Sequence, residues 1–421
     1  MHQRSVFSVL DQSQYVSLCG VFFFLPFSIA CMEIFAGVAL ACFIIKKIFR
    51  PDFGFLKNRL FVILFVFFLC NGLSVFNSDP YIEKSLKALF AKWLSYISLF
   101  VLTADSFGST KRIKKAVEVL LISAFIVGVD GLSQGFLHFE LFGGKPMIEM
   151  TPQMFAMTAA FNHYNSLGFY LTMVLPLAIS LFLFDIMEWR HRVALLLLSG
   201  VLIVCLFLTY SRGSWLSFIL SLLLMAALTK KTRILGVILI LFLGVLLLKP
   251  TLCERFLLIF APTGDAHRFI LWKAALRMFH ENPYFGKGVG TFMDRVKDYT
   301  PTYWGGQYAH NCFLQIAAEA GIFALLSFVA FVGLLLSKAF AAFRRTNDFI
   351  LLGILCAMTG YLFHSFFDNS LYSLQLTFLF WFFAGLMYCL SIRKISDEKT
   401  VYNSCIGSEH ELFPRARNEV K

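Results

Sequence analysis

The chain has 421 residues, of which 58% are hydrophobic and only 15% are charged, and its formal net charge is +12. Soluble domains normally carry about 25% charged residues, so the composition excludes an ordinary soluble protein. The basic residues lie in short clusters between apolar runs, which indicates membrane orientation rather than nucleic-acid binding. Because lipid offers no hydrogen bonds and the apolar runs lack strand-like alternation, we expect an all-α polytopic membrane protein.

Apolar runs of about 20 residues, the length that crosses a bilayer, recur along the chain. Pro26 and Glu33 interrupt the first long run, which predicts two short helices there. The expected spans number about 12 and lie near 15–31, 33–48, 60–76, 89–104, 116–136, 164–185, 191–209, 213–229, 233–249, 311–337, 349–367 and 371–391. The remaining segment, 392–421, mixes both signs of charge and is predicted to be a disordered tail.

The distribution of Lys and Arg predicts the orientation. With the N-terminus in the cytoplasm, the cytoplasmic segments hold 24 of the 37 Lys and Arg residues, and the short outer loops hold few. We therefore expect both termini to be cytoplasmic and four segments to share the outer face. These are the loop 137–163, the turn Ser211–Ser214, the large loop 249–310 and the turn 364–372.

Arg212 lies in "TYSRGSW", between two long apolar runs. An arginine at the centre of a membrane helix costs about 2.5–3.5 kcal/mol or more, so this side chain must face headgroups or a polar cavity. One interpretation is an interfacial anchor that reaches lipid phosphates. The other is an anion clamp, in which the guanidinium and the free N–H groups of a helix N-terminus meet on one phosphate.

The large loop contains the pattern of a short amphipathic helix that starts at Ala266 and ends before Pro283. Its predicted apolar face, which would lie on the membrane or on the helix bundle, consists of Phe269, Trp272, Leu276 and Phe279. Arg268 is near the start of this helix. The stretch "YFGKGVGTF" that follows predicts a tight glycine turn, because no strand precedes it and the spacing of a dinucleotide loop is absent.

His310 ends the large loop and leads into a span that carries Asn311, Gln315 and Glu319 at four-residue spacing. This spacing places the three polar side chains near one helix face. Polar residues in a span indicate either a functional site or a hydrogen-bond network between helices. Histidine is the side chain most easily poised as a base near neutral pH.

Two further polar groups lie at outer helix ends. "FNHYNSLGFYL" offers His163 and Asn165, which suit either sugar hydroxyls or helix capping. His364 and Asp368, four residues apart, are expected to orient one another or a partner, or to be structural. The sequence lacks the motifs of metal-dependent nucleotide-sugar enzymes and ATPases, so we expect no metal and no cofactor. A disulfide between Cys253 and Cys312 has no support beyond their positions beside the loop.

Taken in order, "FNHYNSLGFYL", "TYSRGSW", "HRFILWKAAL…NPYFGKGVGTF", "AHNCFLQIAAEAGIFALL" and "FHSFFD" resemble the O-antigen ligase/polymerase superfamily of multi-span glycosyltransferases. The resemblance is most specific between Phe161 and Asp368. It implies a GT-C-like fold with three parts: N-terminal spans in 1–160, a catalytic region in 161–391 that includes a periplasmic loop, and the cytoplasmic tail 392–421.

The resemblance also implies roles for individual residues. Arg212 and Arg268 match the arginines that hold the donor pyrophosphate, and His310 matches the histidine that activates the acceptor hydroxyl. Substrate contacts are expected from neighbouring residues, namely Asn311, Gln315, His163, Asn165, His364 and Asp368. The implied partners are an undecaprenyl-pyrophosphate-linked glycan, a lipid A–core acceptor and the bilayer of the bacterial inner membrane, with no nucleic acid.

The resemblance most favours an O-antigen ligase that acts by inversion without ATP. An O-antigen polymerase and a protein O-oligosaccharyltransferase share the same motifs. A transporter of lipid-linked oligosaccharides belongs to a different class, and it would carry ionisable residues along a path through the midplane. Here the ionisable residues gather towards one face.

Overall fold

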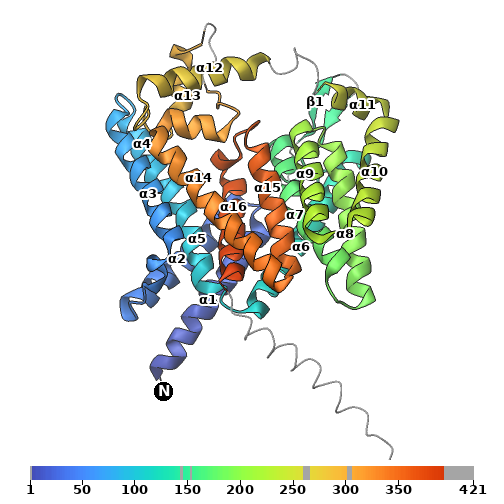
Figure 1. Ribbon diagram of the computed structural model, residues 1–421, viewed down its shortest axis with the longest axis horizontal. Helices are drawn as coiled ribbons and strands as arrows, with labels where there is room; N and C mark the ends of the chain where they lie inside the picture. The colour runs from blue at the N-terminus through green and yellow to red at the C-terminus, as the bar shows by residue number, and fades with distance from the viewer. Residues whose placement is uncertain (1, 143–145, 152–153, 259–265, 301–305, 393–421) are drawn as a thin grey trace, which may run out of the picture.

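The computed structural model describes residues 2–142, 146–151, 154–258, 266–300 and 306–392. The described residues form a bundle of long helices with one small β-hairpin (Figure 1). The first half contains α1 (His2–Phe24), α2 (Ile29–Phe49), α3 (Arg59–Ser74), α4 (Ile82–Lys87), α5 (Leu94–Ser106), α6 (Thr110–Leu132), β1 (Ile148–Thr151) and β2 (Met154–Ala156). The second half contains α7 (Tyr164–Phe184), α8 (Trp189–Leu208), α9 (Arg212–Thr229), α10 (Thr232–Leu248), α11 (Pro250–Leu257), α12 (Ala266–Glu281), α13 (Phe292–Arg295), α14 (Cys312–Thr346), α15 (Phe349–His364) and α16 (Leu374–Ser391).

The prediction of a helical, multi-pass membrane protein is confirmed. In the part of the chain that is described, nine helical segments are long and apolar enough to cross a membrane, or ten if α10 and α11 count as one bent span. A helix lies at each predicted span, but α15 has only 16 residues and α1 is not among the nine. The count of twelve therefore stays a prediction.

The beginning of the chain differs from the prediction. The break between α1 and α2 falls at residues 25–28, where Pro26 lies, and Ser28 caps α2. Glu33 does not interrupt a helix, because it lies within α2 with its side chain exposed. At the end of the bundle that carries the N-terminus, Lys46 bonds Asp11 at 2.9 Å and Asp105 at 2.8 Å, which ties α1, α2 and α5 together.

Helices α7, α15 and α16 form the centre of the bundle. Nearly all of their residues are buried, and α15 packs against α7 and α9. A Cβ added to Gly353 of α15 would lie 2.6 Å from the Cα of Leu177 in α7, so glycine allows these two helices to approach closely. By contrast, α2 and α10 expose many large apolar side chains, as helices that face lipid do.

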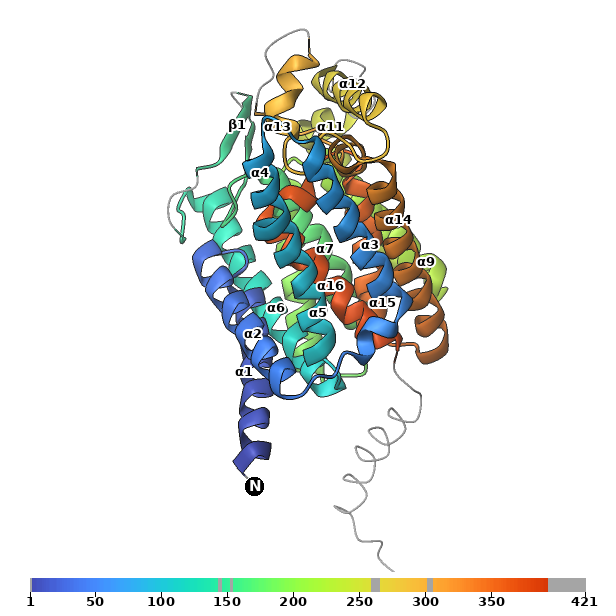
Figure 2. The ribbon, with the colours of Figure 1, turned by 90° about the vertical axis from the view of Figure 1, so that its left-hand side faces the viewer.

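The β-hairpin, α11, α12 and α13 gather at the end of the bundle opposite the N-terminus, which we call the distal end (Figures 1 and 2). The hairpin lies in the predicted loop 137–163 and is the only β-sheet in the described ranges. The bend between α10 and α11 is 101°. It turns the chain sharply where the large loop was predicted to begin.

The predicted helix at 266 is confirmed, but the apolar face that was predicted to lie on the membrane or on the bundle is not the face that packs on the bundle. The face of α12 that packs on the bundle consists of Leu271, Ala274, Ala275 and Met278. Phe269 and Leu276 are exposed instead, with Trp272 half-buried. The small side chains of Ala274 and Ala275 allow α12 to lie close to α14. Ala318 of α14 belongs to the same buried cluster.

The glycine turn after α12 packs against a kink in α14. Gly286, Gly288 and Gly290 all have positive φ, and a Cβ on Gly286 would lie 2.3 Å from the backbone carbon of Glu319. The kink is at Gly321, whose φ of 79° interrupts α14. Glu319 accepts hydrogen bonds from the backbone N–H groups of Gly290 and Phe292 at 3.0 and 3.1 Å, so it fastens the turn to α14.

Candidate active site

The site begins with a hydrogen bond between His310 and Asp368. The Nδ1 atom of His310 lies 3.0 Å from Oδ1 of Asp368, which belongs to the turn between α15 and α16. Burial alone would raise the pKa of the Asp368 carboxyl, but the hydrogen bond and charge of His310 outweigh it and hold that pKa well below its usual range. A carboxylate at this position accepts the Nδ1–H of the imidazole, which leaves Nε2 of the neutral ring as an acceptor.

The backbone of His310 is unusual, because its φ is +49°. This left-handed conformation is uncommon for a residue other than glycine. The surroundings hold it in place: Trp272 of α12 donates to the carbonyl oxygen of His310 at 3.4 Å, and Gln315 accepts from the N–H of Ala309 at 3.1 Å.

A chain of hydrogen bonds leads from Asp368 to the turn before Arg212. The second carboxylate oxygen of Asp368 accepts from the amide of Asn165 at 2.8 Å. The carbonyl oxygen of Asn165 accepts from the hydroxyl of Ser211 at 2.9 Å, and that hydroxyl accepts from Ser214 at 2.8 Å. Residues from α7, α9 and the α15–α16 turn, far apart in the sequence, are thereby joined at the distal end.

A cleft of about 340 Å³ opens beside this chain. It is lined by His163, Asn165, Ser166, Phe169, Tyr308, His310, Asp368, Asn369, Ser370, Tyr372, Ser373 and Leu376. The lining therefore combines a histidine–carboxylate pair with hydroxyl, amide and aromatic groups. Such a surface suits a polar ligand with sugar hydroxyls.

His163 caps α7 at the mouth of this cleft. Its Nδ1 accepts from the N–H of Asn165 at 3.1 Å. Desolvation lowers the pKa of His163, Asp368 opposes this effect, and the electrostatic interaction with His310 adds to it. The neutral ring that results keeps its proton on Nε2, since Nδ1 is an acceptor.

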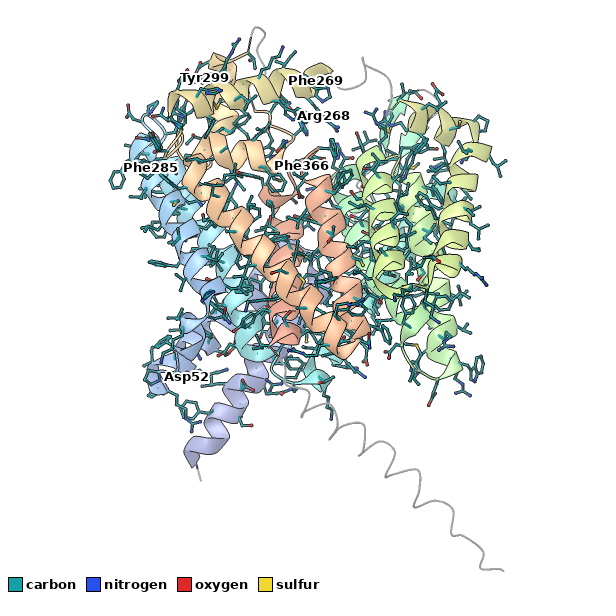
Figure 3. All side chains as sticks on the ribbon, in the orientation of Figure 1. Asp52, Arg268, Phe269, Phe285, Tyr299 and Phe366 are labelled. Atoms are coloured by element: carbon teal, nitrogen blue, oxygen red, sulfur yellow. The ribbon has the colours of Figure 1, made fainter. Side chains whose placement is uncertain are left out.

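The two predicted arginines lie on elements that border this region. Arg212 is the first residue of α9, is half-buried, and donates from Nη1 to the carbonyl oxygen of Leu258 at 2.6 Å. Arg268, labelled in Figure 3, is half-buried in the first turn of α12. It interacts electrostatically with His364. Its neighbour His267 lies edge-on to His310, with 5.9 Å between the ring centroids.

The side chains of three other predicted site residues make their contacts within the protein. Asn311 caps α14 by accepting from the N–H groups of Phe313 and Leu314 at 3.0 Å. Gln315 bonds Asn369 at 2.6 Å. His364 is 2% exposed, stacks on Phe169 at 3.6 Å, and does not line the cleft. Their predicted contacts with substrate stay predictions.

Sequence reasoning did not single out the aromatic lining of the cleft or Arg255. Tyr308 directly precedes the "AHN" stretch, and Tyr372 follows the "FHSFFD" stretch, so their closeness to motifs was the available signal. Within the described ranges, no three His, Cys, Asp or Glu side chains are grouped closely enough to hold a metal ion. Cys253 and Cys312 are both free thiols.

Fold and site together define a multi-pass helical membrane protein with a carboxylate-bonded histidine and bordering arginines at one end of its bundle. The family model described as O-antigen ligase matches residues 197–329, which supports a relationship to the O-antigen ligase/polymerase superfamily. The matched segment contains Arg212, Arg268 and His310. A search of curated proteins found no match.

Proposed function

We propose that the protein is a GT-C-like glycosyltransferase that moves an O-antigen glycan from undecaprenyl pyrophosphate to a sugar hydroxyl of lipid A–core. The observation that carries this proposal is the unbroken hydrogen-bond chain from His310 through Asp368 and Asn165 to Ser211, the residue before Arg212. It brings the candidate base and a candidate phosphate ligand to one end of the bundle. The match to the O-antigen ligase family supports the same class of reaction.

The base is His310. With Nδ1–H donated to Asp368, Nε2 of the neutral ring accepts the proton of the acceptor hydroxyl, and Asp368 stabilises the imidazolium that forms. The hydroxyl oxygen forms a bond to the anomeric carbon while the bond from that carbon to the pyrophosphate oxygen breaks. Attack from the side opposite the leaving group inverts the anomeric centre.

The leaving group is an anion, so it needs positive charge rather than a proton. Arg212 starts α9, and the side chain of the N-cap residue Ser211 does not cap this helix, because its hydroxyl bonds Asn165 instead. The N-terminus of a helix and a guanidinium together favour a phosphate group. Arg268 adds a second guanidinium from α12, and two such groups stabilise the charge that develops on a departing pyrophosphate.

The proposal that the distal end faces the periplasm rests on the distribution of Lys and Arg. The N-terminal end carries the clusters of Lys and Arg that mark the cytoplasm, which supports a periplasmic distal end. We propose residues 161–391 as the catalytic region, because the proposed catalytic residues lie in it, with N-terminal spans in 1–160. A lipid-linked donor reaches such a site from the outer leaflet, where no nucleotide is required.

The test is glycan transfer by the purified protein in nanodiscs, with undecaprenyl-pyrophosphate-linked O-antigen and lipid A–core. We expect His310→Ala to lower the transfer rate by about 10²–10⁴, the usual contribution of a general base. His280→Ala, at an exposed histidine of α12, is the matched control and should keep the wild-type rate. A His310→Ala protein that transfers glycan at the wild-type rate contradicts the proposal.

The same assay separates the other functions. A polymerase would lengthen the lipid-linked glycan without lipid A–core, and a protein O-oligosaccharyltransferase would require a polypeptide acceptor. A transporter would give no covalent product in nanodiscs, which offer no second compartment. Each of these outcomes would replace the ligase assignment.

A further inference from the structure

Two arginines bind α11 and the turn before α9 to each other. Arg255 of α11 donates from Nε to the carbonyl oxygen of Tyr210 at 3.2 Å. In the opposite direction, Arg212 donates from Nη1 to the carbonyl oxygen of Leu258, the residue that ends α11, at 2.6 Å. The position of Arg212 therefore depends on α11.

The turn that Arg255 holds is strained. Tyr210 has a φ of +50° and is 6% exposed. A left-handed conformation costs a residue with a side chain about 1–2 kcal/mol, and it persists where the surroundings hold it. The bond from Arg255 is one such restraint, and it acts two residues before Arg212.

The positive charges of this region also converge. The phenol of Tyr164, the first residue of α7, interacts electrostatically with the carboxylate of Asp368 and with three arginines, Arg255, Arg268 and Arg212. All three arginines are half-buried, and they come from α11, α12 and α9. A phosphate anion near several guanidiniums is stabilised by each of them.

We propose that Arg255 is a third guanidinium of the donor diphosphate site, and that the Tyr164 hydroxyl donates to the same phosphates. This inference rests on the proposed function, because it assigns the donor's diphosphate to that site. The chemistry is binding alone: guanidinium and phenol donate hydrogen bonds to phosphoryl oxygens, and no bond is broken by them. Two phosphoryl groups offer enough oxygen atoms for three guanidiniums from separate helices.

The test measures binding of farnesyl pyrophosphate to the full-length protein in detergent, from the rise in its melting temperature with ligand concentration. We expect Arg255→Gln to weaken binding about 10-fold to 100-fold, as loss of a charge-assisted hydrogen bond does. Arg255→Lys should restore part of the affinity, and Tyr164→Phe should weaken binding without removing charge. Arg277→Gln, at an exposed arginine of α12, is the matched control.

Steady-state transfer supplies the second measurement. Arg255→Gln should raise KM for the lipid-linked donor more than it lowers kcat, whereas a general loss of folding would lower kcat and leave KM unchanged. If Arg255→Gln does not fold, Arg255→Lys and Tyr164→Phe decide the matter, and wild-type affinity in both overturns the inference.

Wild-type protein that neither binds farnesyl pyrophosphate nor transfers glycan contradicts the proposed function itself. Normal transfer by the wild type with unchanged binding by Arg255→Gln contradicts only this inference.

Discussion

Replacing Asp368 with asparagine removes one charge from the proposed site and keeps the size of the side chain. The two carboxylate oxygens accept three hydrogen bonds: from His310 at 3.0 Å and from the N–H of Asn369 at 2.8 Å on one oxygen, and from Asn165 at 2.8 Å on the other. An amide has one acceptor oxygen. In either orientation, the NH₂ group of the asparagine faces a neighbouring group that also donates a hydrogen bond.

Each orientation harms a different part of the site. With the amide oxygen towards His310, the imidazole keeps its tautomer but loses the negative charge that stabilises the imidazolium. With the NH₂ towards His310, Nδ1 becomes the acceptor and Nε2 keeps its proton, so the base is lost. We expect kcat for transfer to fall by about 10²–10⁴, which corresponds to about 2.7–5.4 kcal/mol at 1.36 kcal/mol per tenfold.

The assay is single-turnover transfer in nanodiscs, with the melting temperature measured on the same preparation. Asp348→Asn is the control, because Asp348 caps the opposite end of α15 and asparagine caps helices equally well. We expect this control to keep wild-type kcat and melting temperature. The reasoning is refuted if Asp368→Asn is folded and transfers glycan at the wild-type rate.

The same pair predicts how stability depends on pH. Because the folded protein holds the pKa of Asp368 below its usual range, the carboxylate stabilises the fold above the ordinary aspartate pKa of about 3.9. This stabilisation is lost only as the pH falls from there towards the lower pKa of the folded state. The difference in melting temperature between wild type and Asp368→Asn should thus narrow as the pH falls below about 4. A difference that stays unchanged as the pH falls from about 4 to about 3 would contradict this explanation.

Two glycines give further predictions. A Cβ on Gly213 would lie 2.3 Å from Nε2 of the buried His364, so Gly213→Ala should displace the start of α9, cost about 1–3 kcal/mol and reduce transfer, whereas Gly200→Ala, with open space around it, should be tolerated. Gly286 and Gly306 both have positive φ, but only Gly286 is crowded by the backbone of α14, so Gly286→Ala should lower the melting temperature further than Gly306→Ala. Equal effects within either pair would show that crowding is not the cause.

Much of the helical fold follows from the sequence, because hydropathy and helix breakers depend on local composition. The glycine turn is an example: three glycines within five residues predicted a tight turn, and Gly286, Gly288 and Gly290 all adopt positive φ. The four-residue spacing also predicted that His310 and Asn311 lead into a helix with polar residues along one face. Glu319 shows the limit of that pattern, since it fastens the glycine turn and bonds Tyr372 at 3.2 Å within the protein.

The pairing of side chains across helices could not be predicted in the same way. Spacing within the last outer turn suggested that His364 and Asp368 orient one another or a partner, or are structural, and it does not decide among these alternatives. In the structure His364 ends α15 and enters the core against Phe169, whereas Asp368 lies beyond the helix and meets His310 from a segment 58 residues earlier. Such a contact depends on how helices pack, and one sequence contains no measure of that. For the same reason the sequence did not decide whether the predicted apolar face of α12 lies on the membrane or on the bundle. The contact with the bundle is made by Leu271, Ala274, Ala275 and Met278.

The strained backbone of the described residues is distributed in a way that supports the location of the site. Six residues other than glycine have positive φ, and three of them are helix C-caps, where this conformation is common: His138, Lys230 and Asn347. The other three are Ala159, four residues before His163, Tyr210, two residues before Arg212, and His310 itself. Each costs about 1–2 kcal/mol, and each is held by a hydrogen bond from elsewhere in the fold: from Ala159 to Gln134, from Arg255 to Tyr210 and from Trp272 to His310. Strain of this kind persists where the fold over-determines the local geometry. Here that geometry fixes three segments, which carry the proposed base His310, the proposed phosphate ligand Arg212 and the cleft-lining residue His163. Their arrangement therefore exists before any substrate binds.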